Sequence, residues 1–129
     1  MKYVIFSLTA AMAVAISWSS ASAEIAGRWR VAGKVSSFAF TLDCDFKPVG
    51  DKLGGVCVDA STNTGKVKAG KSHMLTGGSV RGSAVTWTYR SSFLFSKFDV
   101  TYKGVVSGNK MGGTLDAQGH QGEFTAVKE

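Results

Sequence analysis

Proline, histidine and cysteine are scarce in this sequence of 129 residues, which contains one, two and two of them respectively. The two cysteines are not in a C-x-x-C spacing, so the common redox and zinc motifs are excluded. We therefore expect no metal and no cofactor. No segment of helical periodicity is long enough to compete with the alternating pattern described below, which argues against a helical domain.

The longest apolar run stands at the start of the chain and is typical of a bacterial-type export signal. Lys2 precedes an uncharged run over residues 3–18, and Ala21-Ser22-Ala23 then matches the A-x-A cleavage pattern. The run is shorter than the roughly 20 apolar residues that a membrane-spanning helix needs. We expect residues 1–23 to be a signal peptide and residues 24–129 to form one domain without a transmembrane segment, in a periplasmic or secreted protein.

Short stretches of alternating apolar and polar residues, separated by turns rich in glycine, fill the remainder of the chain. This pattern is typical of antiparallel strands that are joined by hairpins and buried on one face. The fold class predicted is all-β, as a single antiparallel up-and-down barrel, with a two-sheet β-sandwich as the alternative. About eight strands are expected, near residues 26–32, 37–46, 53–60, 73–81, 84–91, 96–106, 111–117 and 121–128.

The first hairpin predicts a disulfide. Gly50-Asp51 can form a two-residue loop, because glycine accepts the positive φ that primed turns require. That loop places Cys44 directly opposite Cys57, close to disulfide reach. An even pair of cysteines in an oxidising compartment is also typical of a disulfide.

Three other glycine dipeptides predict further hairpins, at Gly82-Ser83, Gly108-Asn109 and Gly119-His120. The last of these loops would place Leu115 opposite Phe124.

Large aromatic residues gather on the inward faces of the expected strands. An eight-stranded barrel is either filled by its own side chains or holds one small ligand. A packed core without a cavity is therefore an open alternative to a ligand site. The candidate ligand contacts are Trp29, Phe38, Phe40, Trp87, Tyr89 and Tyr102, with Phe93 and Phe95 on either side of Leu94 at a mouth.

The polar residues do not form a catalytic constellation, so we expect no enzyme. Ser72 and His73 are adjacent and would point to opposite faces of a strand. Asp43 and Asp45 fall on an outward face, where they lack the burial that tunes acid–base catalysts. The formal net charge is +6, but the basic stretch Lys66 to Lys71 has no aromatic residue for base stacking, so a nucleic-acid partner is not expected. Contact of this stretch with anionic lipid or glycan stays open.

A family resemblance rests on the two ends of the expected barrel. Gly27-Arg28-Trp29 is a G-x-W at the first strand, and the meander ends in Phe124-Thr125-Ala126-Val127-Lys128. In these features and in length, the chain resembles the calycin group of lipocalins, avidins and fatty-acid-binding proteins, and small secreted bacterial barrels of that shape. It lacks a T-D-Y turn and the biotin contacts of avidins, so no ligand residue is carried over. We expect Trp29 to plug one end, with Lys128 or an arginine stacked on its ring.

These features predict an exported, non-enzymatic binding protein with a small hydrophobic ligand in the barrel interior. One alternative is a protein-interaction module, because small disulfide-bearing barrels with an early G-x-W also resemble secreted bacterial inhibitors of metalloproteases. Those inhibitors use an extended N-terminal arm, whereas only Glu24-Ile25-Ala26 precedes the G-x-W here. The other alternative is a structural envelope protein that docks on a partner through residues 93–95.

Overall fold

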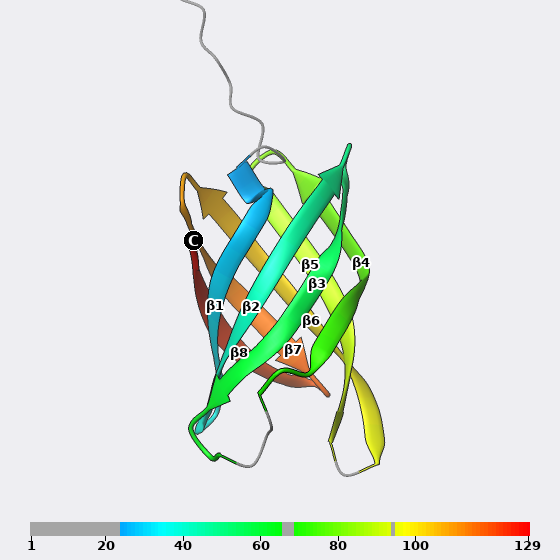
Figure 1. The fold of residues 1–129 in the computed structure, drawn as a ribbon, viewed down its shortest axis with the longest axis vertical. Coiled ribbons are helices and arrows are strands. Elements are labelled where there is room, and N and C mark those ends of the chain that lie inside the picture. Colours follow the sequence, from blue (N-terminus) through cyan, green and yellow to red (C-terminus); the bar gives the residue numbers. More distant parts are fainter. Residues whose placement is uncertain (1–23, 66–68, 94) are drawn as a thin grey trace, which may run out of the picture.

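Eight antiparallel strands follow one another around a closed barrel in the computed structural model, which describes residues 24–65, 69–93 and 95–129 (Figure 1). Each strand pairs with the next, and β1 pairs with β8 to close the ring. The predicted up-and-down barrel is confirmed, and this closure rules out the two-sheet alternative. The strands are β1 Gly27–Val35, β2 Phe38–Val49, β3 Lys52–Thr62, β4 Ser72–Arg81, β5 Ala84–Phe93, β6 Ser96–Ser107, β7 Lys110–Ala117 and β8 His120–Lys128.

Two of the earlier expectations fall wholly or partly outside the described residues. The expected signal peptide over residues 1–23 is one, and the basic stretch from Lys66 to Lys71 is described only at its end. Among the described residues, no helix has both the length and the apolar character to cross a membrane.

Glycine-led turns set three of the hairpins as predicted. Gly50, Gly82 and Gly108 have φ values of 62°, 58° and 60°, which matches the first central position of a type II′ turn. The first turn places Cys44 opposite Cys57, and the two residues form the predicted disulfide with a Cα–Cα distance of 4.0 Å. Both cysteines are buried.

The last hairpin differs from its prediction by one loop position. Gln118 and Gly119 both have positive φ, 54° and 78°, as a type I′ turn requires at its two central residues. The glycine is therefore the second loop residue, and His120 is the first residue of β8. Leu115 consequently faces Gly122, and the predicted pairing with Phe124 is wrong. The shift amounts to two residues in register, so Phe124 keeps its place on the buried face.

One end of the barrel is closed by Trp29. Its side chain is fully buried, and its Nε1 donates a hydrogen bond of 2.9 Å to the carbonyl oxygen of Ile25. Lys128 stands opposite Trp29 in the β1–β8 ladder and holds its Nζ 5.9 Å from the ring centroid. The same Nζ donates to the carbonyl oxygen of Glu24 at 2.8 Å. The predicted plug with a stacked lysine is confirmed.

A layer of aromatic rings fills the middle of the barrel. Trp87 stacks on Tyr102 with ring centroids 4.7 Å apart, and Phe46 and Phe124 meet the Trp87 ring edge-on at 4.9 and 5.2 Å. All four side chains are buried. This part of the interior is packed. The alternative of a core without a cavity predicted such packing for the whole barrel.

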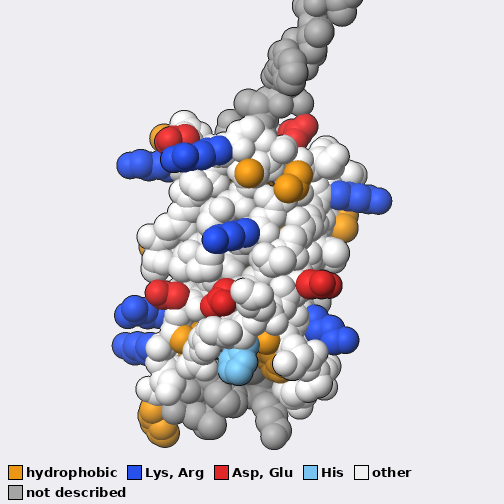
Figure 2. Space-filling model, turned by 180° about the vertical axis from the view of Figure 1, so that it is seen from behind, with side chains coloured by type: hydrophobic (Ala, Val, Ile, Leu, Met, Phe, Trp, Pro, Cys, Tyr) orange, Lys and Arg blue, Asp and Glu red, His pale blue; other side chains and the backbone are white. Residues whose placement is uncertain are grey.

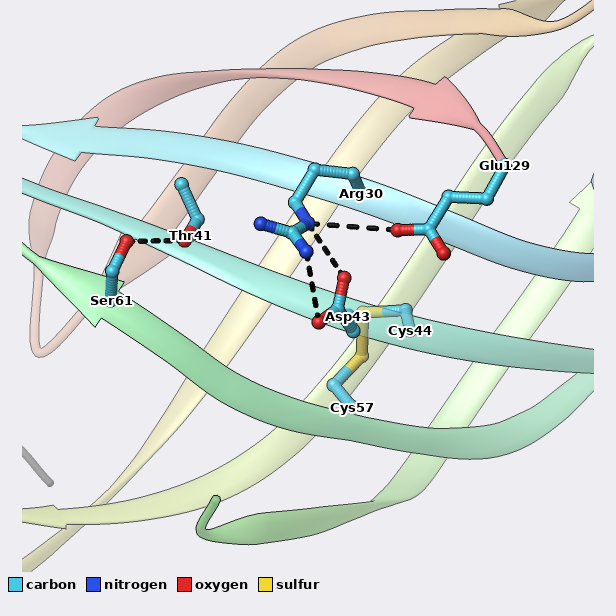
Figure 3. A network of polar contacts seen from close by, with 7 residues as sticks. All are labelled: Arg30, Thr41, Asp43, Cys44, Cys57, Ser61 and Glu129. Carbon is cyan, nitrogen blue, oxygen red and sulfur yellow. Dashed lines mark hydrogen bonds and ion pairs between the residues drawn. A yellow bond between two sulfur atoms is a disulfide. The ribbon is translucent and has the colours of Figure 1, made fainter. Parts of the chain in front are cut away.

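The outer surface carries charges of both signs. Arg30 lies between Asp43 and Glu129, with Nε–O distances of 2.6 and 3.6 Å (Figure 3). The outward position predicted for Asp43 is confirmed. On the rear face, basic and acidic side chains are interspersed and do not gather by sign (Figure 2).

Candidate functional site

A cavity of about 380 Å³ lies at the end of the barrel opposite Trp29, where β1 and β2, β3 and β4, β5 and β6, and β7 and β8 are joined (Figure 1). Small-molecule sites have volumes of about 300–1,000 Å³, so the size suits a small ligand. Much of its wall is apolar, and includes Phe38, Phe40, Leu42, Phe98, Val100 and Ala117. A second hollow, of about 360 Å³, is lined mainly by polar side chains of β6, β7 and β8.

Phe40 shapes the mouth of this cavity because β1 has a glycine in the facing position. Gly33 pairs with Phe40, and the Phe40 ring lies where a Cβ of residue 33 would stand. A side chain at Gly33 would therefore displace this ring. Phe38 stacks on Phe40 with centroids 5.8 Å apart. The two rings form one apolar side of the opening.

Asp59 and His73 form a polar pair beside the cavity, on the two strands that follow β2. His73 is 4% exposed, and its Nε2 lies 3.0 Å from Oδ2 of Asp59. Asp59 itself lines the cavity. The two residues of the pair come from neighbouring strands. His73 on β4 stands opposite Cys57, and Asp59 on β3 stands opposite Leu42.

Both ring nitrogens of His73 are occupied by protein groups. Nδ1 lies 3.3 Å from the carbonyl oxygen of Arg90, which can only accept, so Nδ1 carries a hydrogen and donates it. Nε2 lies 3.0 Å from Oδ2 of Asp59, so the second ring nitrogen is engaged as well. His73 thus has no free nitrogen to accept a proton from a hydroxyl nucleophile. Its neighbour Ser72 is exposed, on the other face of the strand, as predicted.

Tyr89 and Tyr102 join their hydroxyl groups at 2.7 Å beside this pair. Tyr89 lines the cavity and stacks on the His73 ring at 4.8 Å, whereas Tyr102 belongs to the packed layer beneath. Burial raises the pKa of both phenols well above 10, and the nearby Asp59 carboxylate adds a smaller increase. Both hydroxyl groups are therefore neutral at physiological pH.

The cavity gathers some of the predicted ligand contacts. Phe38, Phe40 and Tyr89 line it. Trp87 and Tyr102 lie in the packed layer, and Trp29 closes the other end.

The expected mouth segment is described only in part. Leu94 and the side chain of Phe93 lie outside the described residues. Phe95 is fully exposed in the β5–β6 turn with a φ of 70°, at the same end of the barrel as the cavity. It is not among the residues that line the cavity.

Asp59 is the site residue that sequence reasoning missed. Its signal was present in the predicted hairpin register, because the loop that pairs Cys44 with Cys57 also pairs Leu42 with Asp59. Both pairs stand on the same face of the strand two residues apart. The same two-residue loop that predicts the disulfide therefore also predicts that the Asp59 carboxylate points inward.

Across the described part of the chain, no three side chains among His, Cys, Asp and Glu come together as a possible metal site. No protein-family model matches the chain, and no curated protein matches its sequence. The eight-stranded up-and-down barrel is consistent with a calycin-like shape.

Proposed function

We propose that the protein is a non-enzymatic binding protein that holds one small, largely apolar molecule in the open end of its barrel. The cavity of about 380 Å³ carries this proposal. Its apolar wall and few polar groups are the usual composition of a small-molecule site. Eight-stranded barrels of this kind hold a single small ligand when their own side chains leave room for it.

Export to the periplasm or the exterior is part of the same proposal. The disulfide between Cys44 and Cys57 supports it, because such bonds persist in oxidising compartments and are rare in the cytosol. The signal-like pattern of residues 1–23 points in the same direction.

A docking role as an interaction module or envelope component has less support. Phe95 is fully exposed near the mouth and is suited to contact a partner. Among the described residues it is the one aromatic ring that this turn exposes, and one ring falls well short of the contiguous apolar patch that marks an interface.

Filling the cavity tests the binding proposal. Ala117 lines the cavity, so Ala117→Phe places a ring inside it, whereas Ala84 is exposed beside the β4–β5 turn, at the plugged end, and Ala84→Phe is the matched control. Tryptophan fluorescence is followed during titration with a panel of small apolar compounds. We expect saturable binding by the wild type and by Ala84→Phe, and a loss of at least about tenfold in affinity for Ala117→Phe, because the new ring displaces ligand carbon from the apolar wall.

Circular dichroism confirms that each variant keeps the β-sheet spectrum. A flat response of the wild type across the panel, or equal binding by folded Ala117→Phe, contradicts the proposal.

A further inference from the structure

We propose that the ligand bears a hydroxyl group on an apolar body, and that Asp59 and Tyr89 recognise this group together. Asp59 accepts the hydroxyl hydrogen, and Tyr89 donates its own hydrogen to the hydroxyl oxygen. This assignment rests on the proposed function, because it names the chemical class of the molecule that the cavity holds.

Asp59 presents an unused acceptor to the cavity. Oδ2 is engaged by His73, while Oδ1 has no hydrogen-bond partner among the described residues. The side chain is 18% exposed, and its free oxygen stays accessible, because it is not among the fully buried polar atoms of the described residues that lack a partner. A ligand that covers this oxygen must offer it a donor, because an acceptor that is buried without a partner is costly.

Tyr89 presents the complementary donor. Within the described structure, the hydroxyl of fully buried Tyr102 has one hydrogen-bond partner, the Tyr89 oxygen. Tyr102 therefore donates to Tyr89, because the reverse direction would leave the Tyr102 hydrogen unsatisfied in the core. The hydrogen of Tyr89 is then free for a group in the cavity that Tyr89 lines.

The acceptor and the donor lie on neighbouring parts of one wall. Asp59 is on β3, His73 on β4 and Tyr89 on β5, and the His73 ring contacts both of the others. A hydroxyl is the small group that donates and accepts through a single oxygen. An ether has no hydrogen for Asp59, an ammonium has no acceptor for Tyr89, and a carboxylate brings a second negative charge to Asp59.

Two polar side chains near the opening, Lys71 and His120, do not alter the assignment of Asp59 and Tyr89 to the hydroxyl group. Lys71 is exposed and donates to the Ser92 hydroxyl at 2.9 Å, and His120 is exposed at the start of β8. Both line the cavity from its solvent side. The positive charge of Lys71 favours entry of an anionic group at the rim, so a carboxylate ligand is included as a competing outcome of the test.

The experiment compares four ligands with similar apolar bodies by calorimetric titration: 1-nonanol, its isomer methyl octyl ether, nonanoate and nonylammonium. We expect 1-nonanol to bind about tenfold more tightly than the ether, which is the value of one hydrogen bond to a charged acceptor. Nonanoate and nonylammonium are both expected to bind more weakly than the alcohol.

Variants assign the two contacts. Asp59→Ala should bring the alcohol-to-ether ratio to about one, whereas Asp59→Asn keeps a carbonyl oxygen and should retain most of it while improving nonanoate binding. Tyr89→Phe should weaken the alcohol and the ether alike and leave nonylammonium unchanged. Asp99→Ala is the matched control, because Asp99 is exposed and pairs with Arg90 at 3.4 Å.

The failures are distinguishable. Equal affinities for 1-nonanol and the ether, or tightest binding by nonanoate or nonylammonium, overturn the hydroxyl assignment and leave the binding function standing. If none of the four ligands binds and the wider apolar panel is also silent, the binding function itself fails. Where Asp59→Ala does not fold, the wild-type ratio and Tyr89→Phe still decide the question.

Discussion

At the residue scale, the interior combines apolar packing with a short polar series that the protein itself satisfies almost completely. Asp59 holds His73, the His73 ring stacks on Tyr89, and Tyr89 bonds Tyr102. Such buried groups are tolerated because each has a partner, and an unpaired one would cost about 1–3 kcal/mol. The series ends at the cavity, which Asp59 and Tyr89 both line.

The two buried tyrosines predict a loss of stability in alkali. They are the only tyrosines in residues 24–129, and burial raises the pKa of both above that of an unfolded tyrosine, about 10. Below pH 10 both states are protonated and these groups add no pH dependence. Above it, only the unfolded state releases protons, so the free energy of unfolding should fall by up to about 2.7 kcal/mol per pH unit.

Urea unfolding of the protein of residues 24–129 between about pH 8 and pH 12 measures this slope, and Tyr102→Phe should roughly halve it. Tyrosinate absorbance that rises near pH 10 while the β-sheet spectrum is intact would show that the phenols are not buried.

At the element scale, each hairpin is specified by its own turn, which is why much of the register could be predicted. Gly50, Gly82 and Gly108 stand first in their loops, and there the predicted pairings are confirmed. The last hairpin could not be settled this way, because Gly119 suits either central position of a primed turn. The register is set by the positive φ of Gln118, and nothing in the chemistry of a glutamine side chain predicts that conformation.

The disulfide predicts a measurable contribution to the stability of the β2–β3 hairpin. Cys44 and Cys57 are 13 residues apart, and closing a loop of this size stabilises a fold by roughly 2–3 kcal/mol through the unfolded state. The double variant Cys44→Ala, Cys57→Ala should lose about that much free energy of unfolding and keep its sheet spectrum and ligand binding. Urea unfolding of both proteins with and without reductant makes the measurement. If reduction leaves the free energy of unfolding of the wild type unchanged, the prediction is contradicted.

At the scale of the whole molecule, the barrel has two different ends, and the plugged end could be predicted more fully than the open one. The G-x-W and Lys128 indicated the plug, because a large ring and a stacked cation have a recognisable spacing at the two ends of the chain. The cavity depends instead on summed volumes. Gly33 makes room for the Phe40 ring, and Ala117 contributes only a methyl group to the wall. Alternation shows which residues point inward, but it does not show whether they fill the space.

Native mass spectrometry tests the central claim, that the open end holds one small molecule, most directly. The wild-type protein and Ala117→Phe are purified from the same host and measured both as isolated and after exposure to the apolar panel. We predict one added small molecule per wild-type chain and none on the variant. The same adduct on folded Ala117→Phe, or no adduct on the wild type with any compound, would contradict it.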